Sequence, residues 1–410
     1  MSKQPLSVYE SAGEIELGRG EVISTTDLSA HPGNYPVYSS SAVGEGIFGK
    51  YGRHMFDEEL ITWSIDGGGK PFYRKKHKYS VTNVCGFLRI HRRDLWNYRY
   101  LHAILERLQS GIQFDYQMKA HPSVIRELYK LERIPLAEQN AIADVLDTLD
   151  TAIHQTEAIV EKLKQVKQGL LHDLLTRGVD ANGELRPSYE EAPHLYQDSP
   201  LGWIPKEWEC RQLEKLAKYV NGKTFDAGAW SDIGIPIIRI QNLNGSPEFN
   251  YYTGKVNEAW HIYPGDLLFA WAGQRGVSFG ARLWQGPEGV LNQHIFKVTP
   301  NPEIISKTYL FHLLRFRQTA IEDSAHGFKD SFLHVTRGEL GEIFAAIPSL
   351  REQSLIEERI FAYEKKLLNE EIRLKKLQRM KSALMNDLLT GRVRVTPLLQ
   401  GTSQTPKFEP

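Results

Sequence analysis

The sequence predicts an α+β protein built from two tandem halves, each a mixed α/β globular region followed by a long helix. The main observation is an internal repeat: residues 138–176 align without a gap to residues 352–390, and 12 of the 39 aligned positions are identical. Each copy begins shortly after an Ile-Pro pair and ends in Asp-Leu-Leu-Thr. A chain of 410 residues is also longer than one ordinary domain, which agrees with a duplication.

The two globular regions, residues 1–133 and 201–346, show the same order of patterns. In each region, strand-like runs alternate with Gly-rich turns and are followed by one short helical pattern. Segments 100–112 and 309–321 align without gaps at this helical pattern. We therefore expect two related heads that have diverged much further than the two helices.

The remaining segments complete the division of the chain. Residues 134–176 contain the central helix and residues 347–391 the C-terminal helix. Residues 177–200 are rich in Pro, Gly and acidic side chains, which predicts a linker. Residues 392–410 form a tail, and the part after Pro397 is predicted to be disordered.

Both long helices carry an apolar stripe with the 3/4 spacing of a coiled-coil seam. The polar breaks in the two stripes, Thr156/Glu370 and Lys167/Lys381, fall at equivalent positions. Antiparallel helices need only a local step of the linker, whereas parallel helices would require it to run back along the whole helix. We therefore predict an antiparallel coiled coil separating the two heads, with approximate two-fold symmetry. The alternative is that each stripe packs only on its own head. The stripe residues are Ile142, Leu146, Leu149, Ile153, Thr156, Val160, Leu163, Lys167, Leu170 and Leu174, and their counterparts 214 positions later.

Composition argues against several classes of protein. Only two cysteines, Cys85 and Cys210, are present, so we expect no disulfide framework. This usage of cysteine predicts a protein of the reducing cytoplasm. The polar N-terminal segment lacks the apolar core of a signal peptide, and no apolar run reaches the roughly 18 residues of a membrane helix. The formal net charge is zero, which still allows a local basic patch.

No motif for a catalytic or metal centre stands up to its structural requirements. Residues 44–49 match GxGxxG, but no helical pattern follows the glycines, so a turn between strands is preferred. Residues 217–224 match a permissive P-loop without the apolar strand and the helix that should flank it. HExxH and CxxC are absent. We therefore expect no catalytic residue, no metal ligand and no cofactor in this chain.

The strongest chemical signal is a basic segment in the first head. Between Lys70 and Arg93 there are eight Lys or Arg residues and no acidic residue, with aromatic side chains interleaved. Such residues suit the phosphate backbone of nucleic acid, and the alternative is a solvated basic face. The candidate DNA-binding residues of the first head are Lys70, Arg74, Lys75, Lys76, Lys78 and Arg89.

The second head is less basic and offers amide and guanidinium groups next to its strand-like runs. Arg recognises guanine, and Asn or Gln recognises adenine, through two hydrogen bonds each, although any one such residue is more often an ordinary loop residue. The candidates of the second head are Lys223, Arg239, Gln241, Asn242, Asn244, Gln274, Arg275, Asn292 and Gln293.

This layout resembles the specificity subunit of type I restriction–modification systems. The resemblance rests on the helix starts, Glu138-Gln139 and Glu352-Gln353, on the shared apolar stripe, and on the two Asp-Leu-Leu-Thr ends. The entry to the second head, Leu201–Trp208, is also typical, whereas the first head lacks such an entry. The resemblance covers nearly the whole chain.

The resemblance implies that each head is a target recognition domain that reads one half of a bipartite site in double-stranded DNA. It implies that the helices space the heads and dock two methyltransferase (modification) subunits. Those partners would carry S-adenosylmethionine and methylate adenine, and a restriction subunit that uses ATP and Mg²⁺ to cut DNA can join. The chain itself would be a non-catalytic cytoplasmic subunit with no membrane contact.

Two other functions stay open on the residues alone. A self-contained sequence-specific DNA methyltransferase or nuclease would need a cofactor or metal motif in this chain. A coiled-coil adaptor without any role in nucleic-acid binding would leave the basic segment without a purpose.

Overall fold

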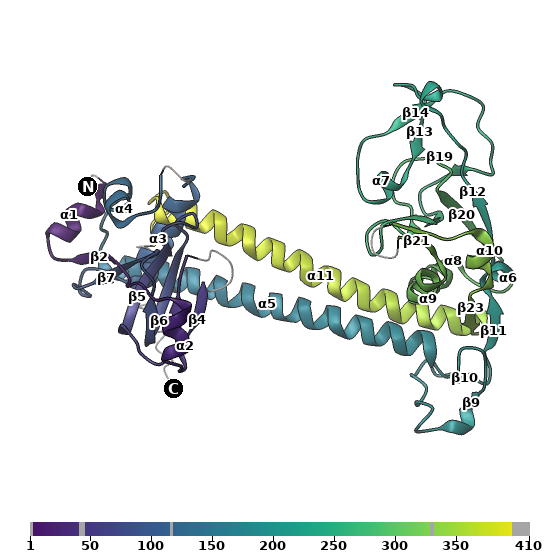
Figure 1. Ribbon diagram of the computed structural model, residues 1–410, viewed down its shortest axis with the longest axis horizontal. Helices are drawn as coiled ribbons and strands as arrows, with labels where there is room; N and C mark the ends of the chain where they lie inside the picture. The colour runs from purple at the N-terminus through teal and green to yellow at the C-terminus, as the bar shows by residue number, and fades with distance from the viewer. Residues whose placement is uncertain (1–2, 41–45, 115–117, 329–331, 396–410) are drawn as a thin grey trace, which may run out of the picture. The chain divides into compact units, whose positions relative to one another are not determined.

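The structure of the protein is a computed structural model that divides into two compact units, each described here by itself. Unit 1 consists of residues 1–158 and 371–410, and unit 2 consists of residues 159–370. Each unit therefore contains one head and one end of each long helix, α5 (Leu136–Thr176) and α11 (Leu350–Leu389) (Figure 1). The described parts of the chain are residues 3–40, 46–114, 118–328 and 332–395.

The head of unit 1 is a six-stranded sheet with the strand order β2-β7-β5-β6-β3-β4. Neighbouring strands are antiparallel, except that β3 and β6 are parallel. Leu101 and Ile104 of α3 share one apolar core with Ile61 and Leu88 of the sheet. The elements are β1 (Gln4–Pro5), α1 (Leu6–Ser11), β2 (Ile15–Arg19), α2 (Thr25–Ala30), β3 (Tyr35–Tyr38), β4 (Ile47–Tyr51), β5 (Phe56–Ser64), β6 (Pro71–Val81), β7 (Cys85–Ile90), α3 (Tyr98–Ser110), α4 (Pro122–Leu128) and β8 (Lys130–Leu131).

The head of unit 2 contains sheets of order β12-β20-β16-β18, β14-β13-β19-β15 and β17-β22-β21, together with the pairs β9–β10 and β11–β23. Its elements are η1 (Pro193–Leu195), β9 (Tyr196–Gln197), β10 (Ile204–Pro205), β11 (Glu209–Gln212), α6 (Leu213–Leu216), β12 (Ala217–Asn221), η2 (Ala227–Ala229), β13 (Ile235–Ile238), α7 (Ile240–Leu243), β14 (Asn250–Tyr252), β15 (His261–Ile262), β16 (Leu267–Ala270), β17 (Ala272–Gly273), β18 (Gly280–Leu283), β19 (Gly289–Leu291), β20 (Ile295–Pro300), α8 (Lys307–Phe316), α9 (Gln318–Ser324), β21 (His326–Phe328), β22 (Phe332–His334), α10 (Arg337–Glu342) and β23 (Phe344–Ile347).

The two heads share strand order and register. In unit 1, β7 lies between β2 and β5, and Gly86 pairs with Arg19. In unit 2, β20 lies between β12 and β16, and Phe296 pairs with Asn221. A parallel pair, β3–β6 or β13–β19, completes each arrangement. The same framework therefore carries different side chains in the two heads, as expected of diverged copies.

Each long helix begins with a buried glutamine that fastens it to its head. Gln139 and Gln353 are equivalent in the repeat, and both are fully buried. The side-chain oxygen of Gln353 accepts a hydrogen bond from Ser306 N at 2.9 Å. Its side-chain nitrogen donates to the carbonyl oxygens of Ile304 at 2.8 Å and Pro348 at 2.9 Å. Gln139 makes the same three bonds, with Asn97 N, Leu95 O and Ile134 O.

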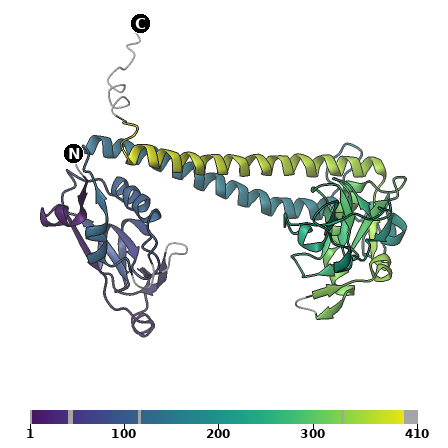
Figure 2. The same ribbon diagram turned by 90° about the horizontal axis from the view of Figure 1, so that it is seen from above.

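Within unit 1, the ends of α5 and α11 run antiparallel, side by side (Figure 1 and Figure 2). Lys381 of α11 contacts Asp150 of α5, with 2.6 Å between Nζ and Oδ1. Leu388, further along α11, shares an apolar core with Ile142, which lies earlier in α5. Contacts that advance along one helix therefore go backward along the other.

Unit 2 repeats this arrangement with the opposite helix ends. Lys167 of α5 contacts Glu364 of α11, with 2.7 Å between Nζ and Oε1. Leu174, further along α5, shares a core with Ile356, which lies earlier in α11. The Lys167–Glu364 pair is the repeat equivalent of the Lys381–Asp150 pair, since both members differ by 214 positions. The antiparallel prediction is thus confirmed within each unit. Each lysine that interrupts the apolar stripe, Lys167 or Lys381, forms an ion pair with the other helix.

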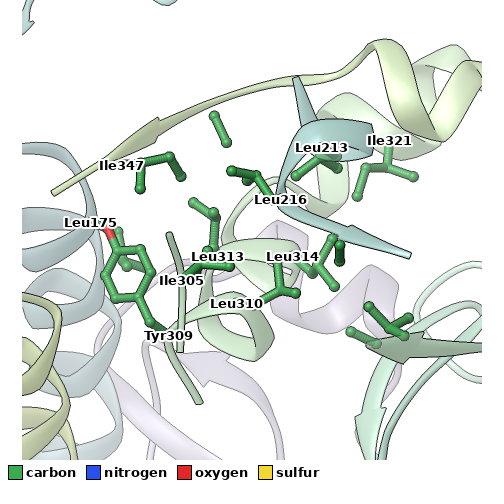
Figure 3. Packing of buried hydrophobic residues seen from close by; sticks show 14 of the residues in the cluster. Leu175, Leu213, Leu216, Ile305, Tyr309, Leu310, Leu313, Leu314, Ile321 and Ile347 are labelled. Atoms are coloured by element: carbon green, nitrogen blue, oxygen red, sulfur yellow. The ribbon is translucent and has the colours of Figure 1, made fainter. Parts of the chain in front are cut away.

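The core of unit 2 shows how a helix end joins its head. Leu175 of α5 lies beside Tyr309 of α8, and Leu310 and Leu313 of α8 continue the same core (Figure 3). Tyr309 and Leu310 have no exposed surface. Full burial of each such leucine contributes roughly 1.5–3 kcal/mol to stability, so the end of α5 is a structural part of the head.

Residues 177–200, predicted as a linker, form an ordered part of unit 2. Arg186 is only 8% exposed and makes an ion pair with the carboxylate of Glu352, one bond of which is 3.0 Å long. Glu352 also accepts hydrogen bonds from Val179 N at 3.0 Å and Trp208 Nε1 at 3.1 Å. Gly178 has a φ of +64°, and a Cβ there would collide with this carboxylate. Turn-forming composition identified the bends but not the buried partner that holds them.

The first residues after α11 also fold back. Arg394 contacts Glu138, the repeat equivalent of Glu352, at 3.2 Å, and Val395 is 2% exposed. The predicted disorder after Pro397 lies outside the described residues. No helix in the described ranges is long and apolar enough to cross a membrane.

Candidate nucleic-acid interface

In unit 2, three chain segments meet where β12, β13 and β19 end. The amide of Lys223 donates to Leu291 O at 2.8 Å, and the amide of Asn292 donates to Ile238 O at 3.0 Å. These bonds place four sequence candidates around one point of the head. We call them the strand-end cluster: Lys223, Arg239, Asn292 and Gln293.

Gly222 makes this meeting possible. A Cβ at Gly222 would lie 2.2 Å from the carbonyl oxygens of both Leu291 and Asn292, so only glycine lets the backbones approach this closely. The segment continues into the short 3₁₀ helix η2 and not into an α-helix. The Gly222-Lys223-Thr224 pattern is thus explained by backbone crossing, which agrees with rejecting a P-loop.

The side chain of Lys223 is held by aromatic rings. Its Nζ donates to the Tyr252 hydroxyl at 2.9 Å and lies 4.7 Å from the centroid of the same ring. The rings of Trp260 and Phe225 follow at 5.3 and 5.7 Å. Cation–π attraction therefore adds to the hydrogen bond in fixing this ammonium group.

Gln293 is oriented by the polar groups of its neighbours. Thr224 donates its hydroxyl hydrogen bond to the side-chain oxygen of Gln293, and the Gln293 side-chain nitrogen lies 3.1 Å from His294 Nε2. Trp271 Nε1 donates to both Gln293 O and Asn221 Oδ1 at 3.0 Å. The only sequence signal for Trp271 is an aromatic residue directly after an apolar run, because its partners come from distant segments.

Asn242 has a structural position. It is 5% exposed, its Oδ1 accepts from Arg239 N at 3.0 Å, and its Nδ2 donates to Ser246 O and Glu248 O at 3.2 and 2.7 Å. An amide with these three bonds has little capacity left for a base edge. The structure therefore favours a loop-forming role for Asn242 over base contact.

The neighbours of Asn242 are more accessible. They lie on and around the short helix α7, where the sequence suggested residues leaving a strand. Gln241 and Asn244 are exposed, and the guanidinium of Arg239 lies 5.0 Å from the ring centroid of Trp230. Gln274 and Arg275 are exposed in the turn between β17 and β18, where Arg275 contacts Glu322 at 3.3 Å.

In unit 1, the basic segment lies largely on strand β6. Lys75, Lys76 and Lys78 are exposed on this strand, and exposed Lys70 directly precedes it. The ammonium of Lys78 lies 5.8 Å from the ring centroid of Tyr35. These four residues keep the accessibility that phosphate contacts require.

The two arginines of the same candidate set are held inside the head. Arg74 is 5% exposed, its guanidinium lies 3.6 Å from the centroid of the Tyr38 ring, and its Nε donates to Thr62 Oγ1 at 3.0 Å. Arg89 makes ion pairs with Glu58 at 2.8 Å and Glu16 at 2.7 Å. The hydrogen bond to Glu58 is the largest cause raising the pKa of Arg89 above its ordinary value. Both arginines therefore have structural partners on the sheet.

The other sequence motifs give no site in the described ranges. Residues 46–49 of the GxGxxG match lead into strand β4, and residues 44–45 lie outside the described residues. No group of three or more His, Cys, Asp or Glu side chains in the described part of the chain is arranged to hold a metal ion.

Comparison with known proteins gives the same duplicated layout. A family model described as the type I restriction modification DNA specificity domain matches residues 13–165 and residues 205–379, which together are well over half of the chain. The chain belongs to this specificity-domain family. The two matches each include a head and most of the following helix, so the family assignment covers both halves of the repeat.

Relatives and solved structures agree with the specificity-domain assignment. The type I restriction enzyme MjaVIII specificity subunit of Methanocaldococcus jannaschii is 24% identical over 390 residues, covering 89% of this chain and 88% of that protein. The EcoBI specificity subunit of Escherichia coli is 25% identical over 196 residues, covering 46% of this chain and 40% of its own length. The crystal structure of the type I restriction–modification S subunit from M. genitalium has a TM-score of 0.56 at 15% identity and covers 94% of this chain and 95% of that chain, which shows a shared fold.

Proposed function

We propose that this chain is the non-catalytic DNA sequence-specificity subunit of a type I restriction–modification complex. The observation that carries the proposal is the duplication: two heads share one strand framework, differ in side chains, and are each built onto the ends of the repeated helices. Two unlike heads of one fold suit the two unlike halves of a bipartite DNA site. Membership of the specificity-domain family and relatives named as specificity subunits support it.

The chemistry of the two heads supports a division between positioning and reading. The exposed lysines of β6 suit phosphate oxygens, which position a protein on DNA without specifying sequence. In unit 2, Gln293 and Arg239 both belong to the strand-end cluster, and amide and guanidinium groups distinguish adenine and guanine in the major groove. The Lys223 ammonium, held by its rings, adds positive charge to the same place.

The exposed face of α11 supports docking of modification subunits. In unit 1, Ile372 and Met380 are 56% and 41% exposed and line an open groove of about 580 Å³ with Lys375, Lys376 and Arg379. In unit 2, Phe361 and Leu368 of the same helix are 67% and 55% exposed. Exposed apolar side chains grouped on a helix mark an interaction surface. In this proposal two modification subunits dock on the repeated helices, and a restriction subunit can join them.

The proposal assigns the reactions to the partners. S-adenosylmethionine would bind the modification subunits, and ATP and Mg²⁺ would serve DNA cleavage by the restriction subunit. The complex would work in the cytoplasm on double-stranded DNA.

The test is to purify the chain with its modification subunits and map the methylated adenines on genomic DNA. We expect a motif of two defined halves separated by unspecified bases. Exchanging residues 1–133 for the first head of another family member should change one half and leave the other unchanged. A single continuous motif, or a motif that survives the exchange, would contradict the proposal.

The main alternative is a self-contained DNA methyltransferase or nuclease. It predicts that the isolated chain binds S-adenosylmethionine or cuts DNA when Mg²⁺ is added. Isothermal titration and a plasmid-cleavage assay on the chain without partners distinguish the two functions. For an adaptor with no role on DNA, the assembled complex would show no salt-dependent affinity for DNA.

A further inference from the structure

We infer that the first head reads its half-site mainly through Asn83, in the turn between β6 and β7, with Glu21 and Ser39 beside it. The basic strand β6 would supply phosphate contacts only. The inference rests on the proposed function and assigns base-reading residues in a head where the sequence singled out only basic residues.

Four backbone bonds that bring the strand ends together in unit 2 recur at the equivalent positions of unit 1. In unit 1 they run from Gly20 N to Cys85 O (3.1 Å), from Glu21 N to Val81 O (3.2 Å), from Thr82 N to Tyr38 O (2.9 Å) and from Ile65 N to Val84 O (3.0 Å). Their equivalents in unit 2, in the same order, run from Gly222 N to Ile295 O (3.1 Å), from Lys223 N to Leu291 O (2.8 Å), from Asn292 N to Ile238 O (3.0 Å) and from Trp271 N to His294 O (3.3 Å).

The close approach of backbones recurs too. A Cβ on Gly20 would lie 2.0 Å from Val81 O, just as a Cβ on Gly222 would collide with Leu291 O. A glycine is therefore required at the same place in both heads. The residues that follow these glycines, Glu21 and Lys223, occupy equivalent positions with opposite charge.

The turn after the parallel strand is the same in both heads. Cys85 N donates to Thr82 O at 2.9 Å, and Ile295 N donates to Asn292 O at 3.2 Å, so the hydrogen bond of each turn joins residues three positions apart. Asn83 and Gln293 follow the first residue of each turn. An amide side chain thus stands at the same position of both heads, while the residues around it differ.

The surroundings of Asn83 leave it available for DNA. Asn83 is partly exposed, and in the part of the chain that the structure describes no hydrogen bond engages its side-chain amide. Glu21 next to it is exposed, and Ser39 accepts a hydrogen bond from Thr82 Oγ1 at 2.9 Å. An amide recognises adenine, a carboxylate recognises cytosine, and a hydroxyl can contact several bases. An ammonium group on β6, in contrast, suits phosphate.

The position of the basic strand fits this division. Lys76 and Lys78 precede Asn83 by seven and five residues on the strand that runs into the turn. At about 3.3 Å per residue, Lys78 lies roughly 15 Å before the turn. DNA whose bases face the turn can therefore have its backbone follow β6.

The experiment uses the complete complex with modification subunits, after the head exchange has assigned one half-site to each head. Asn83→Ala should raise methylation of sites with a wrong base in the first head's half by about 5- to 150-fold relative to the correct site, the worth of one bidentate contact. Discrimination in the other half should not change. The matched variant Gln293→Ala should lower base discrimination in the second head's half and leave the first head's half unchanged. Lys76→Gln should lower base discrimination in neither half.

A second variant guards against a folding defect. Asn83→Asp keeps the size of the side chain and the turn but removes the amide hydrogens, so it should loosen the same half-site as Asn83→Ala. Wild-type discrimination in both Asn83 variants, or loss of base discrimination in Lys76→Gln, would overturn the inference. Failure of the proposed function is distinguishable, because it would appear as the absence of a bipartite motif in the wild-type complex.

Discussion

At the scale of single residues, Gln139 and Gln353 show how one side chain can define where a helix starts. Each is fully buried and satisfies one amide and two carbonyl groups of the loops around it. An apolar residue of the same size would leave all three buried groups without partners. The Glu-Gln pair in both copies of the repeat is thus explained by a joint between helix and head.

This explanation predicts the effect of Gln353→Leu. Leaving buried polar groups unsatisfied costs roughly 1–3 kcal/mol, so the free energy of unfolding should fall by about that amount. Urea denaturation followed by circular dichroism measures it. Gln378→Leu, at an exposed position of the same helix, is the control and should change little. Equal effects of the two substitutions would contradict the assigned role of Gln353.

At the scale of elements, the segment after α5 is held by charge as much as by apolar packing. Arg186 and Glu352 are both nearly buried, and the glutamate carboxylate has further bonds from Val179 and Trp208. Breaking a buried pair by removing one partner leaves an uncompensated charge. This pair therefore keeps residues 177–200 on unit 2.

Arg186→Met should lower the free energy of unfolding by roughly 3–5 kcal/mol. It should also make residues 177–200 sensitive to limited proteolysis in the folded protein. Arg211→Met is the control, because Arg211 pairs with Glu209 at an exposed site and should contribute no more than about 1 kcal/mol. A protease-resistant segment in Arg186→Met would show that apolar packing alone is sufficient.

At the scale of the whole molecule, neutral net charge and DNA binding are compatible because the basic side chains are grouped. Lys75, Lys76 and Lys78 are exposed on one strand of unit 1, whereas Arg89 of the same segment is neutralised by two glutamates. Counting charges along the chain could not separate these cases, since the glutamates that pair with Arg89 come from other strands.

Changing Lys75, Lys76 and Lys78 together to Gln should weaken DNA binding by the complex and flatten its salt dependence. Each lost phosphate contact lowers the slope of log affinity against log salt by about 0.9. The methylated sequence should stay the same. Lys130→Gln, outside the six-stranded sheet, is the control. The slope is measured by fluorescence anisotropy at several salt concentrations. An unchanged slope in the triple variant would show that the lysines of β6 do not contact the DNA backbone.

The sequence predicts some parts of this fold and misses others. The predicted bounds of both long helices agree with the structure to within three residues, because their stripe is periodic and repeated. The packing of residues 177–200 was missed because Arg186 finds Glu352 far along the chain. In the candidate site, Gln293 and Lys223 were recognised by residue type, but Trp271 and the Asn83 turn required the strand register. Local sequence patterns do not predict contacts between residues that are far apart along the chain.

The discontinuity of unit 1 has a consequence for synthesis on the ribosome. Unit 2 is one continuous segment, whereas unit 1 needs residues 371–395 to place Lys381, Leu388 and Arg394 against the start of α5. At about 5–20 residues per second, residue 371 follows residue 158 by tens of seconds. The head that is translated first is therefore the one that is completed last. Until residues 371–395 have been synthesised, the apolar stripe at the start of α5 stays exposed to solvent.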